Sequence, residues 1–145
     1  SVRDALTGSY NRRHLDAFDA AQREHGWAAI GIDLDHFKQV NDQQGHDQGD
    51  QVLIEFSRFL DRRAGAGDAV VRLGGDEFAL LLAGADAQRL EAVVEGLRRD
   101  VDRAPCAFSM GAALREGGET LAATLARADG QMYSVRAATR TNVTA

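Results

Sequence analysis

Charged and amide side chains gather in four short groups along this sequence. The groups are Asp33 with Asp35 and Lys38, Asn41 with Asp50, Asp76 with Glu77, and Arg136 with Arg140. Acidic side chains that lie close together repel one another unless a cation is bound between them, and hard carboxylate oxygens select magnesium or manganese. If the fold brings the acidic groups together, they outline a site for a divalent metal ion.

Each group also has a simpler interpretation. Asp35 follows an apolar run and could be a helix N-cap, and Asp50 could cap the helix that it opens. The Gly-Gly-Asp sequence at 74–76 is typical of a tight turn. Arg136 and Arg140 could do no more than stabilise the carboxyl end of a helix. The occurrence of all four groups in one short chain favours the metal site.

Hydrophobic periodicity predicts the elements that carry these groups. Apolar residues with helical spacing predict helices over 7–24, 48–63, 90–101 and 120–137, the last with Leu121, Leu125, Ala128, Met132 and Val135 on one face. Compact apolar runs predict strands over 27–33, 69–73, 78–83 and 106–114. This order predicts an α+β fold, in which helices pack on a mixed sheet.

The predicted strands place the acidic groups at strand ends and turns. The strand over 27–33 ends at Asp33, and Asp35 follows it. The strands over 69–73 and 78–83 form a hairpin, which puts Asp76 and Glu77 at or beside its tip. The glycines at 74 and 75 permit the positive φ that such a turn needs.

Composition limits the classes of protein that fit. The chain has 145 residues, 44% hydrophobic and 27% charged, which predicts one globular domain over 1–145. It has neither a signal peptide nor the roughly 18 to 20 apolar residues of a membrane span, so we expect a cytoplasmic domain without membrane contact. The net charge of −5 argues against nonspecific binding of nucleic acid. Cys106, the single cysteine, excludes an internal disulfide and is expected to be a small core residue.

Two segments closely resemble the motifs of a known family. Residues 72–78 read Arg-Leu-Gly-Gly-Asp-Glu-Phe, and residues 33–42 read Asp-Leu-Asp-His-Phe-Lys-Gln-Val-Asn-Asp. They resemble the signature and the D-x-D-x-F-K-x-x-N-D motif of the GGDEF family of bacterial diguanylate cyclases. Further matches follow in the family's order: Asp-Ala-Leu-Thr-Gly at 4–8, Asn-Arg-Arg at 11–13, Gly-His at 45–46, Gly-Asp at 49–50, Ser109-x-Gly111, and Ala-Asp at 128–129 with Tyr133.

The resemblance implies a fold and an activity. The fold would be nucleotidyl-cyclase-like, with a ferredoxin-like core and a five-stranded mixed sheet surrounded by helices. The activity would be the condensation of two GTP molecules into cyclic di-GMP and two pyrophosphates, with two magnesium or manganese ions per active site. Each domain would bind one GTP, so the active form would be a homodimer. The domain would be one part of a longer protein, which can be membrane-anchored, with an N-terminal sensory or regulatory domain.

The resemblance also implies roles for particular residues. The metal ligands would be Asp33, Asp76, Glu77 and the carbonyl of Leu34, and the catalytic residues would be Asp76, Glu77 and Lys38. The GTP-binding residues would be Phe37, Asn41, His46, Asp50, Gly74, Gly75, Arg136 and Arg140. Within this set, Asn41 and Asp50 would bind the guanine edge. Because a carboxylate at position 50 accepts two donors that adenine does not present, GTP is expected to be preferred over ATP.

The sequence departs from the family pattern at a few positions. Many members bind the product at an inhibitory R-x-x-D site, but residues 65–68 read Gly-Ala-Gly-Asp, so Asp68 remains without its arginine. Glycine cannot replace a guanidinium, and we therefore predict weak or absent product inhibition there, with Arg62 and Arg63 as poor substitutes. Less consequential departures are Gln44, Ala107, Arg136 and Thr139.

Three alternatives remain open from the sequence. The domain could bind GTP or cyclic di-GMP for regulation without turnover, although the acidic residues are intact. It could catalyse a different nucleotide reaction on the same scaffold, such as formation of a mixed cyclic dinucleotide. It could also be a purely structural interaction domain, which would not need so many acidic residues at strand ends.

Overall fold

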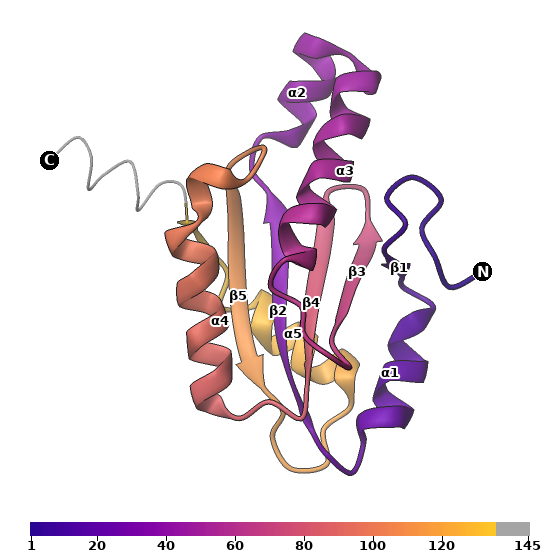
Figure 1. Ribbon diagram of the computed structural model, residues 1–145, viewed down its shortest axis with the longest axis vertical. Helices are drawn as coiled ribbons and strands as arrows, with labels where there is room; N and C mark the ends of the chain where they lie inside the picture. Colours follow the sequence, from indigo (N-terminus) through magenta and orange to yellow (C-terminus); the bar gives the residue numbers. More distant parts are fainter. Residues whose placement is uncertain (136–145) are drawn as a thin grey trace, which may run out of the picture.

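The computed structural model describes residues 1–135, which form a six-stranded sheet flanked by α-helices (Figure 1). The strands are β1 (Tyr10–Asn11), β2 (Trp27–Leu34), β3 (Ala69–Gly74), β4 (Glu77–Ala83), β5 (Phe108–Leu114) and β6 (Tyr133–Ser134). The helices are α1 (His14–Gln22), α2 (Phe37–Gln44), α3 (His46–Asp61), α4 (Ala87–Arg99), the 3-10 turn η1 (Val101–Arg103) and α5 (Leu121–Asp129). The predicted α+β fold is confirmed.

Strand β2 lies at the centre of a mixed sheet with the order β1-β3-β4-β2-β5-β6. It pairs antiparallel with both β4 and β5, and β3 and β4 form the predicted hairpin. Only the short β1 runs parallel to its neighbour, β3. The central strand is buried on both faces, as its almost continuous apolar sequence requires.

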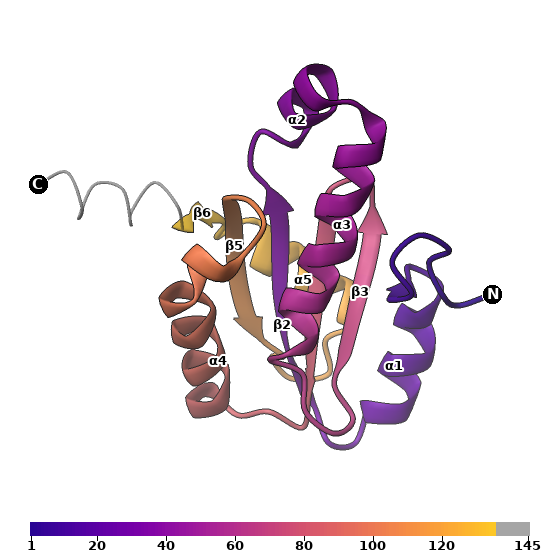
Figure 2. The ribbon, with the colours of Figure 1, turned by 45° about the horizontal axis from the view of Figure 1, so that its top comes forward.

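Helices α3 and α4 cover one face of the sheet and enclose the larger core (Figures 1 and 2). Phe56 of α3 is fully buried, and its ring centroid lies 5.4 Å from that of Phe78 and 5.3 Å from that of Phe108. Burial of large aromatic side chains stabilises a domain strongly, so this cluster fixes α3 on the sheet.

Helices α1 and α5 cover the opposite face, around Phe18, Trp27 and Leu121. The buried indole of Trp27 donates a hydrogen bond to the Thr124 hydroxyl, with a distance of 3.0 Å. Helix α5 approaches the sheet closely at Gly111, where an added Cβ atom would lie 2.0 Å from the Ala128 carbonyl oxygen. Only glycine therefore fits at this point of β5.

The N-terminal helix is shorter than predicted, because it covers His14–Gln22 rather than 7–24. Asp4 closes a turn by accepting hydrogen bonds from the backbone and the hydroxyl of Thr7, and β1 follows. The last helix also ends early: α5 stops at Asp129, and the chain then forms β6. Val135 is buried in the core on the other face of the sheet, so its predicted place on the face of α5 is wrong.

Two further features were not predicted. The periodicity did not indicate α2, because none of its residues is buried and its polar sequence carries no apolar stripe. The sheet has six strands rather than five: the four strands predicted from apolar runs, and β1 and β6, which add two residues each at the edges. Cys106 packs against the larger core as expected, and burial raises its pKa to about 12. In the described part of the chain, no helix is long and apolar enough to cross a membrane.

Candidate functional site

The acidic groups meet where β2 ends and the β3–β4 hairpin turns (Figure 1). Asp33 lies directly opposite Glu77 on β4 and Ser109 on β5. The backbone N–H of Leu34 donates to the Asp76 carbonyl at 3.1 Å, which holds the turn against the end of β2. Opposed residues of an antiparallel pair project to the same side of a sheet, so the Asp33 and Glu77 carboxylates are neighbours.

The electrostatics of Asp33 indicate a place that favours positive charge. Its pKa is raised, first by burial and then by the negative charges of Glu77, Asp76, Asp129 and Asp35. In residues 1–135 no three His, Cys, Asp or Glu side chains converge closely enough to hold a metal ion by themselves. Magnesium commonly uses one or two carboxylates and completes its shell with water and substrate phosphates. The donor set at Asp33 and Glu77 therefore fits magnesium bound together with a phosphorylated substrate.

The side chain of Arg72 holds the hairpin turn in place. Its guanidinium donates to the Gly75 carbonyl at 3.0 and 2.9 Å and to the Asp4 carboxylate at 3.3 and 3.2 Å. Burial would raise the pKa of Asp4, but hydrogen bonds from Thr7 and Arg72 outweigh it and lower the pKa. Gly75 has a φ of +24°, in line with the predicted glycine turn. Asp4 and Arg72 belong to the motifs at 4–8 and 72–78, but no role was predicted for either residue.

One interpretation of Asp35 was a helix N-cap, but the structure shows a different role. Its carboxylate accepts hydrogen bonds from Ser109 Oγ at 2.7 Å and from Ser134 Oγ at 3.2 Å. Its backbone N–H donates to the Ala107 carbonyl at 2.9 Å. Asp35 therefore ties the end of β2 to both β5 and β6, which is a structural role beside the site.

Helix α2 and the start of α3 project beyond the sheet, above the hairpin (Figure 2). They carry Phe37, Lys38, Asn41, His46 and Asp50, of which Lys38, His46 and Asp50 are exposed. Asp50 lies inside α3 instead of opening it, since α3 begins at His46, so it does not cap the helix.

Glycine 49 lets α2 and α3 meet beside these residues. A Cβ atom added at Gly49 would lie 1.8 Å from Asn41 Oδ1. The amide of Asn41 is therefore fixed against α3, on the same projecting pair of helices as Asp50.

Asp68 lies away from the hairpin turn and is fully committed to internal bonds. Its side chain has no exposed surface and pairs with the guanidinium of Arg89. It also accepts hydrogen bonds from the backbone N–H groups of Gly65, at 2.7 Å, and Ala83, at 2.9 Å. The predicted positions Arg136, Thr139 and Arg140 lie outside the described residues.

The family comparison agrees with this arrangement across nearly the whole chain. A family model described as diguanylate cyclase, GGDEF domain, matches residues 1–142. The chain belongs to the GGDEF family. This GGDEF domain is 33% identical over 145 residues to diguanylate cyclase DgcM of Escherichia coli, covering 92% of the chain and 35% of the relative. It is 36% identical over 164 residues to response regulator PleD of Caulobacter vibrioides, covering 99% of the chain and 36% of the relative. The chain thus spans about a third of the length of these curated relatives.

Solved structures share the fold at similar identity. Diguanylate cyclase SiaD of Pseudomonas aeruginosa, crystallised with its activator SiaC, superposes with a TM-score of 0.79 at 34% identity, covering 97% of this chain and 59% of that one. The GGDEF domain of DgcB from Caulobacter crescentus, in complex with c-di-GMP, superposes with a TM-score of 0.78 at 28% identity, covering 97% of this chain and 91% of that one. The family predicted from the sequence is confirmed.

Proposed function

We propose that this domain is a diguanylate cyclase, which condenses two GTP molecules into cyclic di-GMP and releases two pyrophosphates. The observation that carries the proposal is the register of β2 and β4, which sets Asp33 opposite Glu77 beside the glycine turn. Relatives named as diguanylate cyclases, DgcM and SiaD, support it.

In the proposed reaction, the 3′-hydroxyl of one GTP attacks the α-phosphorus of the other, and pyrophosphate leaves in line. Two magnesium or manganese ions, when bound, would stabilise charge on the entering and leaving oxygens. The ligands of these ions would be Asp33, Asp76, Glu77 and the Leu34 carbonyl. Asp76 and Glu77 would also be catalytic residues, together with Lys38. Lys38 lies exposed just beyond β2, where its ammonium group would bind phosphate oxygens.

The glycine turn leaves room for a triphosphate. Neither Gly74 nor Gly75 has an atom within 4 Å of the place where a Cβ would stand, so a ligand can approach the backbone there. Arg136 and Arg140 would add positive charge for the phosphates.

Guanine would bind on the projecting helices. Asp50 would accept the N1–H and N2–H donors of the base, Asn41 would complete its polar edge, and Phe37 and His46 would border it. A carboxylate opposite adenine would be left without these two donors, which would lower the affinity for ATP and favour GTP.

Product inhibition through the site at 65–68 should be weak. Position 65 is glycine, and Asp68 is already paired with Arg89 and covered from solvent. Arg63 is no substitute, because it pairs with Asp100. We expect initial rates to change little as cyclic di-GMP is added, and tight product binding centred on Asp68 would contradict this.

The test is to incubate the purified domain with GTP and magnesium and to resolve the products by liquid chromatography. We expect cyclic di-GMP from the wild type and none from Asp76→Ala. Magnesium with GTP should also raise the melting temperature of the wild type but not of Asp33→Asn, which reports metal binding independently of turnover.

A silent wild type would have two explanations, which a second version separates. Fusion to a dimeric coiled coil would restore product if only dimerisation was missing. Continued silence, together with metal-dependent GTP binding, would favour a regulatory binding module over an enzyme.

A further inference from the structure

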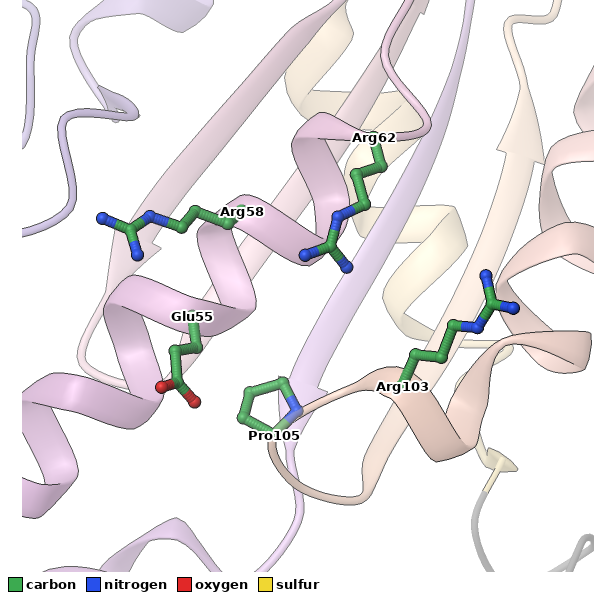
Figure 3. Close-up of a pocket in the computed structure, with 5 residues that line it drawn as sticks. All are labelled: Glu55, Arg58, Arg62, Arg103 and Pro105. Atoms are coloured by element: carbon green, nitrogen blue, oxygen red, sulfur yellow. The ribbon is translucent and has the colours of Figure 1, made fainter.

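A cleft lies between α3 and the segment after α4, on residues that the proposed reaction does not use (Figure 3). It has a volume of about 260 Å³ and is lined by Glu55, Arg58 and Arg62 from α3 and by Arg103 and Pro105 from the opposite wall. We call it the arginine cleft. Arg62 extends from α3 over the cleft, whereas the Arg103 side chain on the opposite wall is directed away from Arg62 and Arg58 turns outward along α3 (Figure 3).

The three guanidinium groups of the arginine cleft carry charge that the described residues 1–135 do not neutralise. Arg58, Arg62 and Arg103 make no side-chain hydrogen bond or ion pair there, whereas the adjacent Arg63 pairs with Asp100. Most other arginines of the described chain are bonded to a carboxylate or a carbonyl, as Arg72 and Arg89 are. Unpaired positive charge is therefore concentrated at one place on a protein whose net charge is −5.

A solvated helix end explains only part of this arrangement. Arg58 lies in the last turn of α3 and Arg62 is its C-cap, where positive charge is favourable. Arg103 belongs to η1, a separate element, and its position across the cleft owes nothing to the dipole of α3. Like charges around one cleft repel, and an anion bound between them would remove that repulsion.

We propose that the arginine cleft binds a phosphate oxyanion, separately from the active site. The planar guanidinium fork of Arg62 presents paired donors that match phosphate oxygens, and the side chains of Arg103 and Arg58 would turn in to add further donors. The phosphate would come from free pyrophosphate or from the phosphate group of a nucleotide.

Glu55 allows the proposal to be tested in the opposite direction, by a substitution that should strengthen binding. Its carboxylate lines the same cleft, where it accepts a hydrogen bond from Gln51 at 3.1 Å and forms no ion pair with Arg58. It would repel an anion bound by the arginines. Replacing Glu55 with glutamine should therefore tighten the binding of a simple oxyanion, while replacing an arginine should weaken it.

The experiment is a calorimetric titration of the whole domain with pyrophosphate at low salt in the presence of EDTA. Without divalent metal the carboxylates of the proposed active site should repel pyrophosphate, so we expect a signal independent of the proposed cyclase activity. We expect a dissociation constant below about 1 mM, weakened about tenfold in Arg62→Gln and in Arg103→Gln and tightened severalfold in Glu55→Gln. Arg99→Gln, which removes an exposed arginine of α4 outside the cleft, should bind as the wild type does.

Parallel titrations with inorganic phosphate and 5′-GMP identify the source. Tighter binding of 5′-GMP assigns a nucleotide, and tighter binding of pyrophosphate assigns the free anion. Circular dichroism melts confirm that each variant is folded. No binding below about 1 mM, or equal losses in Arg62→Gln and Arg99→Gln, would overturn the proposal, because the attraction would then be absent or diffuse.

Discussion

Arg72 joins three parts of the molecule through one side chain. It contacts the Gly75 carbonyl within the hairpin turn and the Asp4 carboxylate in the N-terminal loop, 68 residues away in sequence. The turn that presents Asp76 and Glu77 is therefore positioned by a residue that is not itself among the proposed catalytic groups.

Replacing Arg72 with methionine should lower the rate of cyclic di-GMP formation by roughly ten- to a hundredfold, because small displacements of reacting groups cost that much. Asp4→Asn should have a smaller effect, since the two bonds from Arg72 to Gly75 remain. Initial rates at saturating GTP measure both variants. Equal rates in Arg72→Met and the wild type would show that the turn holds its shape without this side chain.

Glu119 predicts a specific dependence of stability on pH. Bidentate hydrogen bonds from Arg127, at 2.7 and 2.8 Å, and a bond from Thr124, at 2.7 Å, lower its pKa from 4.5 to about 2. Because the folded pKa lies below the unfolded one, the carboxylate stabilises the fold above pH 4.5, and this contribution is lost as the pH falls toward 2.

Thermal melts from pH 7 to pH 2 test this. Glu119→Gln should be less stable than the wild type at pH 7, and the difference should shrink as the acid is added. Glu116→Gln is the matched control, since Glu116 also lies near Arg127 but is largely exposed. A constant difference between Glu119→Gln and the wild type across the range would contradict the prediction.

For single residues, the sequence predicted best the positions that depend on one strand or one turn. The strand that carries Asp33 and the hairpin that carries Glu77 have strong local signals, whereas the β2–β4 pairing that makes these two residues neighbours was not predicted. The pairing of Asp4 with Arg72, and of Asp68 with Arg89, depends on segments far apart in the chain. Such pairs have no periodicity that a single sequence could reveal.

At the scale of the elements, the packing of α5 requires a close approach to β5. Gly111 has no room for a Cβ atom, because the Ala128 carbonyl would lie 2.0 Å away. Helix α5 also contacts β2, the strand that carries Asp33, so its position affects both a core and the site.

Gly111→Ala should destabilise the domain by about 1 to 3 kcal/mol, as overpacking of a core generally does. Gly118→Ala is the control, since a Cβ atom there would meet nothing within 4 Å and its φ is not in the left-handed region. Urea unfolding followed by circular dichroism measures both. If Gly111→Ala is as stable as Gly118→Ala, α5 can move away from β5 at little cost.

Elements with a buried apolar face were predicted well, and exposed or very short ones were not. The strands β2 to β5 and the helices α3 and α4 were placed within a few residues, because each buries a stripe of large apolar side chains. Helix α2 has no fully buried residue and only Phe37 and Val40 partly buried against the core, and β1 and β6 are too short to show an alternating pattern. The helices predicted over 7–24 and 120–137 were too long because turns and edge strands interrupt them.

At the scale of the whole molecule, the proposed reaction needs two copies of the domain. If each domain binds one GTP, as we propose, two sites must face each other before the two nucleotides can react. The projecting helices and the hairpin turn lie at one end of the sheet, which leaves that end open to a second copy (Figure 2).

The rate of cyclic di-GMP formation should therefore rise with about the square of the protein concentration while the monomer predominates, and then become proportional to it. Rates measured over a hundredfold range of dilution, with GTP held in excess, test this. Sedimentation at the same concentrations provides the control for the state of association. Strict proportionality at all concentrations, with a monomer in sedimentation, would contradict a dimeric enzyme.

The two-residue strands at the sheet edges have a consequence for behaviour at high concentration. A long open edge offers its unpaired N–H and carbonyl groups to any other chain and promotes aggregation. Here β1 and β6 each present only two residues, so an incoming strand would gain little by pairing with them. Pairing at β1 or β6 should thus not start fibril growth, even when copies of the domain meet often in concentrated solution.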